Sequence, residues 1–447
     1  MSVATPSAKS HERVTGRWVR DYEIATRKEW AVYYLKLVLG TPVPWLICAY
    51  AFLSFVSRAG VEIAAWATAI LTTCYIFVDR FSSSREFSFF RVGGDFFLLG
   101  YLIVGIVSAA NTTSTEEAFA SLSGVRWVFL VYAITYCWEL FPGLNRVLTL
   151  MVGASCLAAV YGIWQHFTGV DLLAGTALTN APIPGSVFFL STSFFNTPEV
   201  LGTLLAMTLP FPAAAYLLAD RRDLNFVRWT SLAICMLLLL AMFWTYRPGI
   251  WMAALIGTIV TILMQGRQVL GFILPIIGMF AAVIFLAYPS PDAMLNGVQE
   301  FESVRGDRQR QQINTQVQLW QTDQQSLWVG VGRKAMDAAN YDPGTGNVYF
   351  QVLAQSGLLG AGFYLLFILG SLLATYRIFQ EIPRTHYWHR VLISGALASQ
   401  IGFHVAGLYW STLAEGLALN LFVLVISAAS YLSEHYGRGL VSDDQSL

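Results

Sequence analysis

The chain has 447 residues, of which 56% belong to hydrophobic types and only 12% are charged. That charged share is about half of what soluble domains carry, and the 27 basic and 27 acidic residues cancel. The high hydrophobic share and low charged share exclude an ordinary cytosolic enzyme and a disordered regulator. The zero net charge excludes a nucleic-acid-binding protein, because no net positive field would attract a polyanion. Repeated apolar runs of about 17–25 residues, long enough to cross ~30 Å of hydrocarbon, instead predict a protein that spans a membrane many times.

The predicted fold class is an all-α polytopic membrane protein, because in lipid a helix satisfies its own backbone polar groups. About twelve transmembrane helices are expected, together with one long extracytoplasmic loop that contains short helices. The regions are a partly interfacial N-terminal segment 1–40, nine spans within 41–287, the loop 288–346, three spans within 347–432 and a tail 433–447. The predicted spans lie near 41–57, 61–79, 92–110, 125–141, 147–165, 198–219, 226–246, 248–265, 269–287, 356–377, 391–409 and 413–432.

Lysine and arginine predict the orientation, because cytoplasmic loops carry an excess of these residues. Most of them lie in segments that share one face if the N-terminus is cytoplasmic, among them Arg13–Lys36 and Arg377–Arg390. We therefore expect both termini in the cytoplasm and the loop 288–346 on the outer face.

The long loop carries two features of its own. Ile313, Val317 and Trp320 recur at helical spacing and predict an amphipathic helix. The segment 309–325 is rich in glutamine, which suits either a solvated helix face or a surface that binds a hydroxyl-rich sugar. Composition leaves both open.

Arg247 is the most informative polar residue. An arginine near the membrane interior is costly, so its presence indicates either a function or a side chain that reaches the surface. It stands in Phe243–Trp251, at the outer junction of two predicted spans, and Pro248 directly follows it. Proline favours the first position of a helix, and an arginine beside free helix amides suits a diphosphate. The alternative is an arginine that only ends a helix and extends to the surface.

Arg305, Arg308 and Arg310 form a second basic group in the long loop. They are candidates for binding phosphate, and the alternative is a solvated run of charge.

Four titratable residues near the outer span ends are candidate general bases, the histidines most naturally near neutral pH. Each could equally be a packing residue. They are His166, Glu199, His404 and Glu415.

Several motifs in a fixed order resemble the O-antigen ligase/polymerase superfamily of membrane glycosyltransferases. They are Tyr161-Gly-Ile-Trp-Gln165, Phe195-Asn-Thr-Pro-Glu-Val-Leu201, Tyr246-Arg-Pro-Gly-Ile-Trp251, Leu319-Trp320, Trp328-Val-Gly-Val-Gly332 and the block from Asn347 to Gly360. The resemblance covers roughly residues 145–380, and the last block is its most specific part.

The resemblance implies an enzyme that takes a glycan from undecaprenyl diphosphate at the periplasmic face of a bacterial inner membrane and joins it to an acceptor hydroxyl. Arg247 matches the family's arginine, and one of Arg305, Arg308 and Arg310 matches the one in the loop. Asn347 and Tyr349 fall in the block expected to contact the glycan. No metal or cofactor is expected, because arginines can stabilise the departing diphosphate. The implied partners are the lipid-linked oligosaccharide, an acceptor glycan, the bilayer, and chain-length or export proteins.

One departure bears on the reaction. The ligases carry a histidine directly before the asparagine of the last block, where this chain has Gly346. Similarly, the family's arginine four residues before the loop tryptophan falls on Gln316. The ligase mechanism therefore cannot simply be carried over, and the missing histidine favours a polymerase of O-antigen or exopolysaccharide units over a ligase that transfers to lipid A-core or to protein. A transporter or flippase of lipid-linked oligosaccharide is the alternative from another class.

Overall fold

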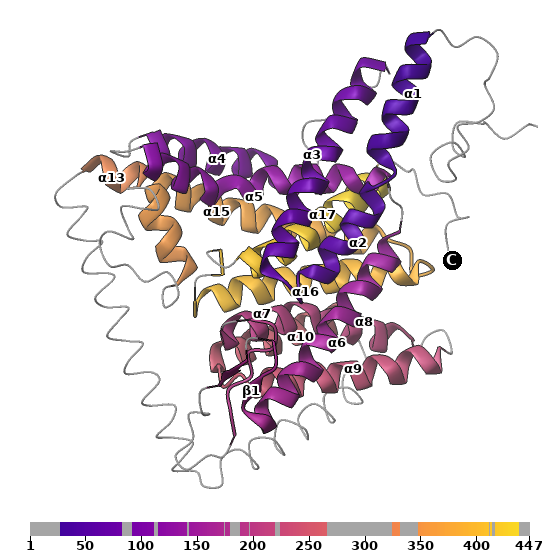
Figure 1. Ribbon diagram of the computed structural model, residues 1–447, viewed down its shortest axis with the longest axis vertical. Helices are drawn as coiled ribbons and strands as arrows, with labels where there is room; N and C mark the ends of the chain where they lie inside the picture. Colours follow the sequence, from indigo (N-terminus) through magenta and orange to yellow (C-terminus); the bar gives the residue numbers. More distant parts are fainter. Residues whose placement is uncertain are drawn as a thin grey trace, which may run out of the picture.

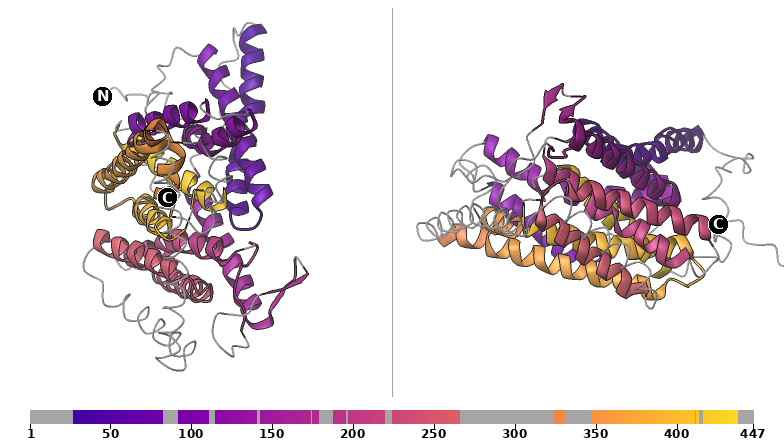
Figure 2. Two further views of the ribbon diagram at one scale, coloured as in Figure 1. Left: turned by 90° about the vertical axis from the view of Figure 1, so that its left-hand side faces the viewer. Right: turned by 90° about the horizontal axis from the view of Figure 1, so that it is seen from below.

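The computed structural model describes residues 27–82, 92–110, 115–140, 143–173, 175–178, 188–195, 197–219, 224–265, 324–330, 347–410, 412–413 and 416–437. Nearly all of these residues are helical, and the strands among them form one antiparallel hairpin, β1 Val170–Asp171 with β2 Thr176–Ala177. The hairpin projects from the bundle in the left-hand view of Figure 2. The helices (Figure 1) are α1 Arg27–Gly40, α2 Val43–Leu53, α3 Arg58–Ser82, α4 Asp95–Ala110, α5 Thr115–Leu140, α6 Leu144–Thr168, α7 Pro198–Thr208, α8 Pro210–Ala219, α9 Asn225–Phe243, α10 Pro248–Gln265, α13 Gln324–Val329, α15 Val348–Glu381, α16 Tyr387–Gly407 and α17 Gly416–Gly437.

Eight stretches of the described helices are long and apolar enough to cross a membrane. Val32–Leu53 joins α1 to α2, and Pro198–Ala219 joins α7 to α8. The others are Arg58–Asp79, Leu144–Thr168, Asn225–Phe243, Pro248–Gln265, Val348–Glu381 and Gly416–Tyr436. The chain is therefore a multi-pass, all-α membrane protein, while the number of twelve spans stays a prediction.

Each predicted span within the described residues coincides with a helix or a pair of helices, but several bounds differ. The predicted span 198–219 is two helices that meet at Leu209, where Pro210 removes a backbone donor. Helices α5 and α15 begin before the predicted spans because hydropathy marks only the part of a helix suited to hydrocarbon. The predicted span 269–287 lies outside the described residues, as does the amphipathic helix expected around Ile313.

The centre of the bundle is the α7–α8 pair, in which every residue from 200 to 219 is buried. Small residues let the neighbouring helices approach closely. A methyl group added at Gly395 of α16 would overlap the ring of Phe211, and one added at Gly257 of α10 would lie 3.2 Å from the carbonyl oxygen of Ala398. The right-hand view of Figure 2 shows α15, α16 and α17 running along one another beside this centre.

Contacts between helix ends define one end of the bundle, here called the site end. It includes the beginnings of α3, α7, α10, α15 and α17 and the end of α16. The contacts are Trp410 Nε1 to Thr203 Oγ1 at 3.0 Å, Tyr349 Oη to the His404 carbonyl at 3.1 Å, Asn420 Nδ2 to Glu62 Oε1 at 3.5 Å, and the packing of Gly249 against Tyr409.

Candidate anion-binding site at one end of the bundle

The turn between α9 and α10 fixes the backbone of Arg247. Tyr246 has a φ of 51°, in the left-handed region that non-glycine residues seldom adopt. The carbonyl of Arg247 accepts the amides of Ile250 and Trp251 at 3.0 and 3.3 Å, so Arg247 is the residue that precedes the first turn of α10. Pro248 then occupies the first helical position, where its missing N–H costs nothing. The sequence prediction that Arg247 opens a helix is confirmed.

Arg247 pairs with Glu199, which lies in the first turn of α7. The Nε of Arg247 is 2.7 Å from Oε1 of Glu199, and the two side chains are 28% and 24% exposed. The Nε–H bond does not point at an acceptor, so the contact is between charges and is not a directed hydrogen bond. No described residue forms a hydrogen bond with Nη1 or Nη2 of Arg247. The structure thus joins two predicted site residues, and the part of the chain that it describes gives the terminal nitrogens of the guanidinium no hydrogen-bond partner.

His166 lies beside this turn, near the end of α6, in a stack of aromatic rings. Its imidazole lies between Trp244, at a centroid distance of 4.4 Å, and Phe188, at 5.0 Å, with interplanar angles of 9° and 14°. The ring of Tyr246 is 6.1 Å away. Nδ1 lies 2.7 Å from the carbonyl oxygen of Phe189, and because a carbonyl only accepts, Nδ1 carries the proton. Nε2 forms no hydrogen bond with any described residue.

Gln165 holds the segment 188–195 against α6. Its Oε1 accepts the amides of Ser193 at 2.6 Å and Thr192 at 3.1 Å, while Nε2 donates to the Ser193 carbonyl at 2.9 Å. Ser193 has a φ of 54°, so this brace stabilises a second left-handed residue. The Ser191 amide donates to the Trp244 carbonyl at 3.3 Å, which ties the segment to the turn before Arg247. Sequence reasoning did not identify this role, although a fully buried glutamine at a helix end is a signal for one.

His404 lies in a separate group of buried aromatic residues at the site end. Aromatic rings surround it, and its Nδ1 is buried with no hydrogen-bond partner among the described residues. The rings of Phe403, Phe422 and Tyr364 have centroids 5.4, 5.2 and 6.1 Å from its imidazole. The structure does not bring His404 into the aromatic stack around His166.

Asn347 and Tyr349, predicted to contact the glycan, have structural contacts of their own. Oδ1 of Asn347 accepts the Tyr349 amide at 2.8 Å and so caps the beginning of α15. The Tyr349 hydroxyl donates to the His404 carbonyl. These bonds align the start of α15 with the end of α16.

Two glycines, one in the motif Trp328–Gly332 and one in the block Asn347–Gly360, allow these two motifs to pack against each other. Gly357 interrupts α15 with a φ of 63°, and a methyl group there would overlap the backbone of Trp328. Gly330, with a φ of 78°, similarly packs against the carbonyl of Gln355. The end of α13, together with Gly330 directly after it, and the kink in α15 therefore contact each other backbone to backbone, which only glycine allows.

Several predicted residues lie outside the described part of the chain: Arg305, Arg308, Arg310, Glu415, Gln316, Gly346 and most of the glutamine-rich segment. Within the described residues, no three His, Cys, Asp or Glu side chains gather in a way that could hold a metal ion.

The paired carboxylate and guanidinium determine the chemistry available at the site. Both side chains are about a quarter exposed, and no directed hydrogen bond joins Nε of Arg247 to Glu199. An incoming anion competes with Glu199 for Arg247, and a phosphate can form two parallel hydrogen bonds with the guanidinium. No protein-family model matches the chain, and no curated protein matches it either. The function is therefore argued from the geometry.

Proposed function

We propose that the protein is a membrane glycosyltransferase that uses a lipid diphosphate-linked glycan as its donor. The observation that carries the proposal is Arg247, fixed at the start of α10. Within the described residues its carboxylate partner is Glu199, and its terminal nitrogens Nη1 and Nη2 form no hydrogen bond. The resemblance of the motifs around Arg247 and Asn347 to the O-antigen ligase/polymerase superfamily supports undecaprenyl diphosphate as the carrier.

In the proposed reaction, an acceptor hydroxyl attacks the anomeric carbon of the donor sugar. The bond from this carbon to the diphosphate oxygen breaks, and the diphosphate leaves with both electrons of that bond. Arg247 stabilises the added negative charge, with help from an arginine of the group Arg305, Arg308 and Arg310. Direct displacement inverts the configuration at the anomeric carbon.

Glu199 is the proposed base that accepts the proton of the acceptor hydroxyl. Oε1 of Glu199 lies 2.7 Å from Nε of Arg247, beside the place proposed for the diphosphate, and a diphosphate that competes for Arg247 would release this carboxylate to act as a base. His166 is the second candidate base, through Nε2, although its stacked ring and its bond to Phe189 fit equally well with holding the turn in place.

The proposed acceptor is another lipid-linked repeat unit, which makes the protein a polymerase of O-antigen or exopolysaccharide. Gly346, in place of the family histidine, favours this over transfer to lipid A-core or protein. The proposed location is the bacterial inner membrane, with both termini cytoplasmic and the site end facing the periplasm. Most lysines and arginines lie in segments that this orientation assigns to the cytoplasm.

The direct test is reconstitution of the purified protein with a defined lipid-linked repeat unit, followed by analysis of glycan length. We expect wild-type protein to lengthen the glycan and Arg247→Ala to lower the rate by about 10²–10³, as when one charge-stabilising donor is removed. Arg146→Ala, an exposed arginine at the other end of α6, is the matched control and should keep its activity.

Two results would contradict the proposal. One is an unchanged rate for a correctly folded Arg247→Ala variant. The other is movement of the lipid-linked glycan across the bilayer with no new glycosidic bond, which would indicate a transporter.

A further inference from the structure

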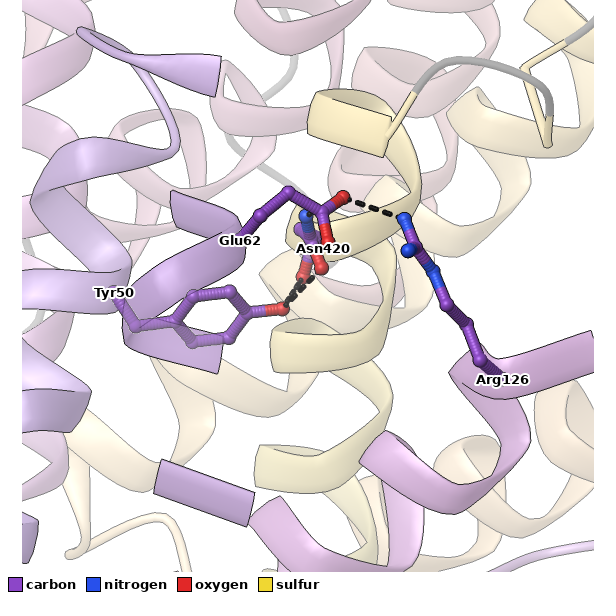
Figure 3. A network of polar contacts seen from close by, with 4 residues as sticks. All are labelled: Tyr50, Glu62, Arg126 and Asn420. Atoms are coloured by element: carbon purple, nitrogen blue, oxygen red, sulfur yellow. Dashed lines mark hydrogen bonds and ion pairs between the residues drawn. The ribbon is translucent and has the colours of Figure 1, made fainter. Parts of the chain in front are cut away.

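A second arginine–glutamate pair lies at the site end, on helices other than those that carry Arg247. Arg126 of α5 donates from Nη2 to Oε1 of Glu62 on α3 at 2.8 Å. Their side chains are 38% and 23% exposed, so the pair is open on one side. Figure 3 shows Glu62 reaching toward both Arg126 and Asn420.

Buried polar groups hold the carboxylate of Glu62 in position. Asn420 of α17, which is 3% exposed, donates from Nδ2 to the same oxygen of Glu62 at 3.5 Å. The hydroxyl of the fully buried Tyr50 is 2.6 Å from the Asn420 carbonyl and 3.2 Å from its Oδ1 (Figure 3). Gly416 makes room, because a methyl group there would lie 2.8 Å from Oε1 of Glu62.

Both partners keep hydrogen-bonding capacity. Oε2 of Glu62 accepts no hydrogen bond from any described residue, and in the same part of the chain Nε and Nη1 of Arg126 donate none. An ion pair that joins helices offsets its desolvation best when its remaining lone pairs and N–H groups are also hydrogen-bonded, and the described residues leave several of these groups of Glu62 and Arg126 unbonded. Oε2 of Glu62 and the Nε and Nη1 nitrogens of Arg126 are therefore not hydrogen-bonded by the described residues.

An apolar surface continues from the pair toward the membrane interior. Trp66, one turn after Glu62, stacks on Phe129, one turn after Arg126, at a centroid distance of 6.4 Å. Ile63, Ile70 and Phe129 are 71%, 55% and 44% exposed. Ile63, Trp66 and Ile70 follow the helical spacing of a single stripe on α3. A charged pair at the end of an exposed apolar stripe fits an amphiphile, with its headgroup on the pair and its chain on the stripe.

We propose that Glu62 and Arg126 bind the headgroup of phosphatidylethanolamine, with its phosphate on Arg126 and its ammonium on Oε2 of Glu62. The pair is neutral as a whole, and a headgroup with one charge of each sign satisfies both partners. A purely anionic headgroup on Arg126 would place its charge next to the carboxylate of Glu62, because Oε1 of Glu62 is only 2.8 Å from Nη2 of Arg126. A choline headgroup has no N–H to donate to Oε2.

The full chain is reconstituted in nanodiscs with equimolar phosphatidylethanolamine and phosphatidylglycerol and is then released from them. Native mass spectrometry measures which lipid the protein retains. We expect wild-type protein to retain phosphatidylethanolamine in an excess of at least about fivefold, equivalent to roughly 1 kcal/mol. Glu62→Gln keeps the side-chain shape but removes the anionic partner, so the preference should shift to phosphatidylglycerol. Arg126→Gln should retain less of both lipids.

The controls use another ion pair, between Lys36 of α1 and Asp79 of α3 at 2.7 Å, whose side chains are each 15% exposed. Lys36→Gln and Asp79→Asn should leave the lipid ratio unchanged. Equal retention of both lipids by wild-type protein would overturn the proposal, as would a Glu62→Gln variant that keeps the wild-type ratio and loses only thermal stability. Glu62→Gln decides the outcome by itself if Arg126→Gln does not fold. The result is independent of glycan transfer, because the readout is bound lipid.

Discussion

Glu199 has two possible roles at Arg247, and substitution by glutamine separates them. If Glu199 is the base, Glu199→Gln should lower the rate of glycan transfer by about 10²–10⁴. The same change removes a competing charge from Arg247, so the donor should bind at least as tightly as to wild-type protein. The measurements are single-turnover transfer and donor binding on the same preparation.

The matched control is Glu381→Gln, at the opposite end of α15, which should change neither quantity. Loss of donor binding together with activity in Glu199→Gln would show that the carboxylate only positions Arg247, and would contradict its role as base.

Gln165 shows how a single buried amide stabilises the site. Gln165→Ala leaves the amides of Thr192 and Ser193 without their acceptor, and each unsatisfied group costs about 1–3 kcal/mol. We expect faster hydrogen exchange at residues 191–195 and a lower rate of transfer. Gln351→Ala is the control, because Oε1 of Gln351 is buried without a partner in the described structure. Hydrogen exchange at residues 191–195 should not change in this variant.

At the residue scale, sequence reasoning identified Arg247 and Glu199 because a charge at the end of an apolar run is conspicuous. It did not predict that the two form a pair, since that depends on how α7 and α10 pack. Gln165 appeared only within a motif, because its role depends on the backbone of a segment far from it in sequence. Chemically conspicuous residues can be found this way, whereas their partners depend on tertiary structure.

At the scale of elements, the contact between α13 and α15 depends on two glycines in left-handed conformation. Gly357→Ala places a side chain at a φ of 63° and against the backbone of Trp328, so it should destabilise the protein by at least about 1–2 kcal/mol. The measurement is the midpoint of thermal unfolding in detergent.

Gly362 provides the control within the same helix. A methyl group there meets no atom within 4 Å, so Gly362→Ala should keep the wild-type midpoint or raise it. A Gly357→Ala variant as stable as Gly362→Ala would show that the kink in α15 is not required.

The helices themselves were largely predictable, because hydropathy responds to burial in lipid, and each predicted span within the described residues coincides with a helix or a pair of helices. The interruptions were not. The break at Leu209 lies inside a continuous apolar run, where hydropathy does not change. The kink at Gly357 lies at the beginning of the predicted span 356–377, where hydropathy marks the end of a span and not a kink within one longer helix. Local backbone geometry and close packing determine them, and neither contributes to a hydropathy pattern.

At the scale of the whole molecule, the proposed orientation predicts which loops a membrane-impermeant thiol reagent can reach. Leu173→Cys lies in the exposed hairpin at the site end, and Arg384→Cys lies in the exposed turn between α15 and α16. We expect the first to react in intact cells and the second only after permeabilisation. The opposite pattern would place the site end in the cytoplasm and exclude transfer at the periplasmic face.

The burial of α7 and α8 has a consequence for biogenesis. A segment with no residue facing lipid between 200 and 219 gains little from the bilayer alone, and its neighbours must arrive before it is stable. One of them, α16, is synthesised long after it, yet the Tyr387 hydroxyl of α16 bonds to the Ala215 carbonyl at 2.9 Å. The centre of the bundle therefore stays incomplete until the last helices emerge from the ribosome. Chains truncated before α16 should be recognised and degraded by membrane quality control.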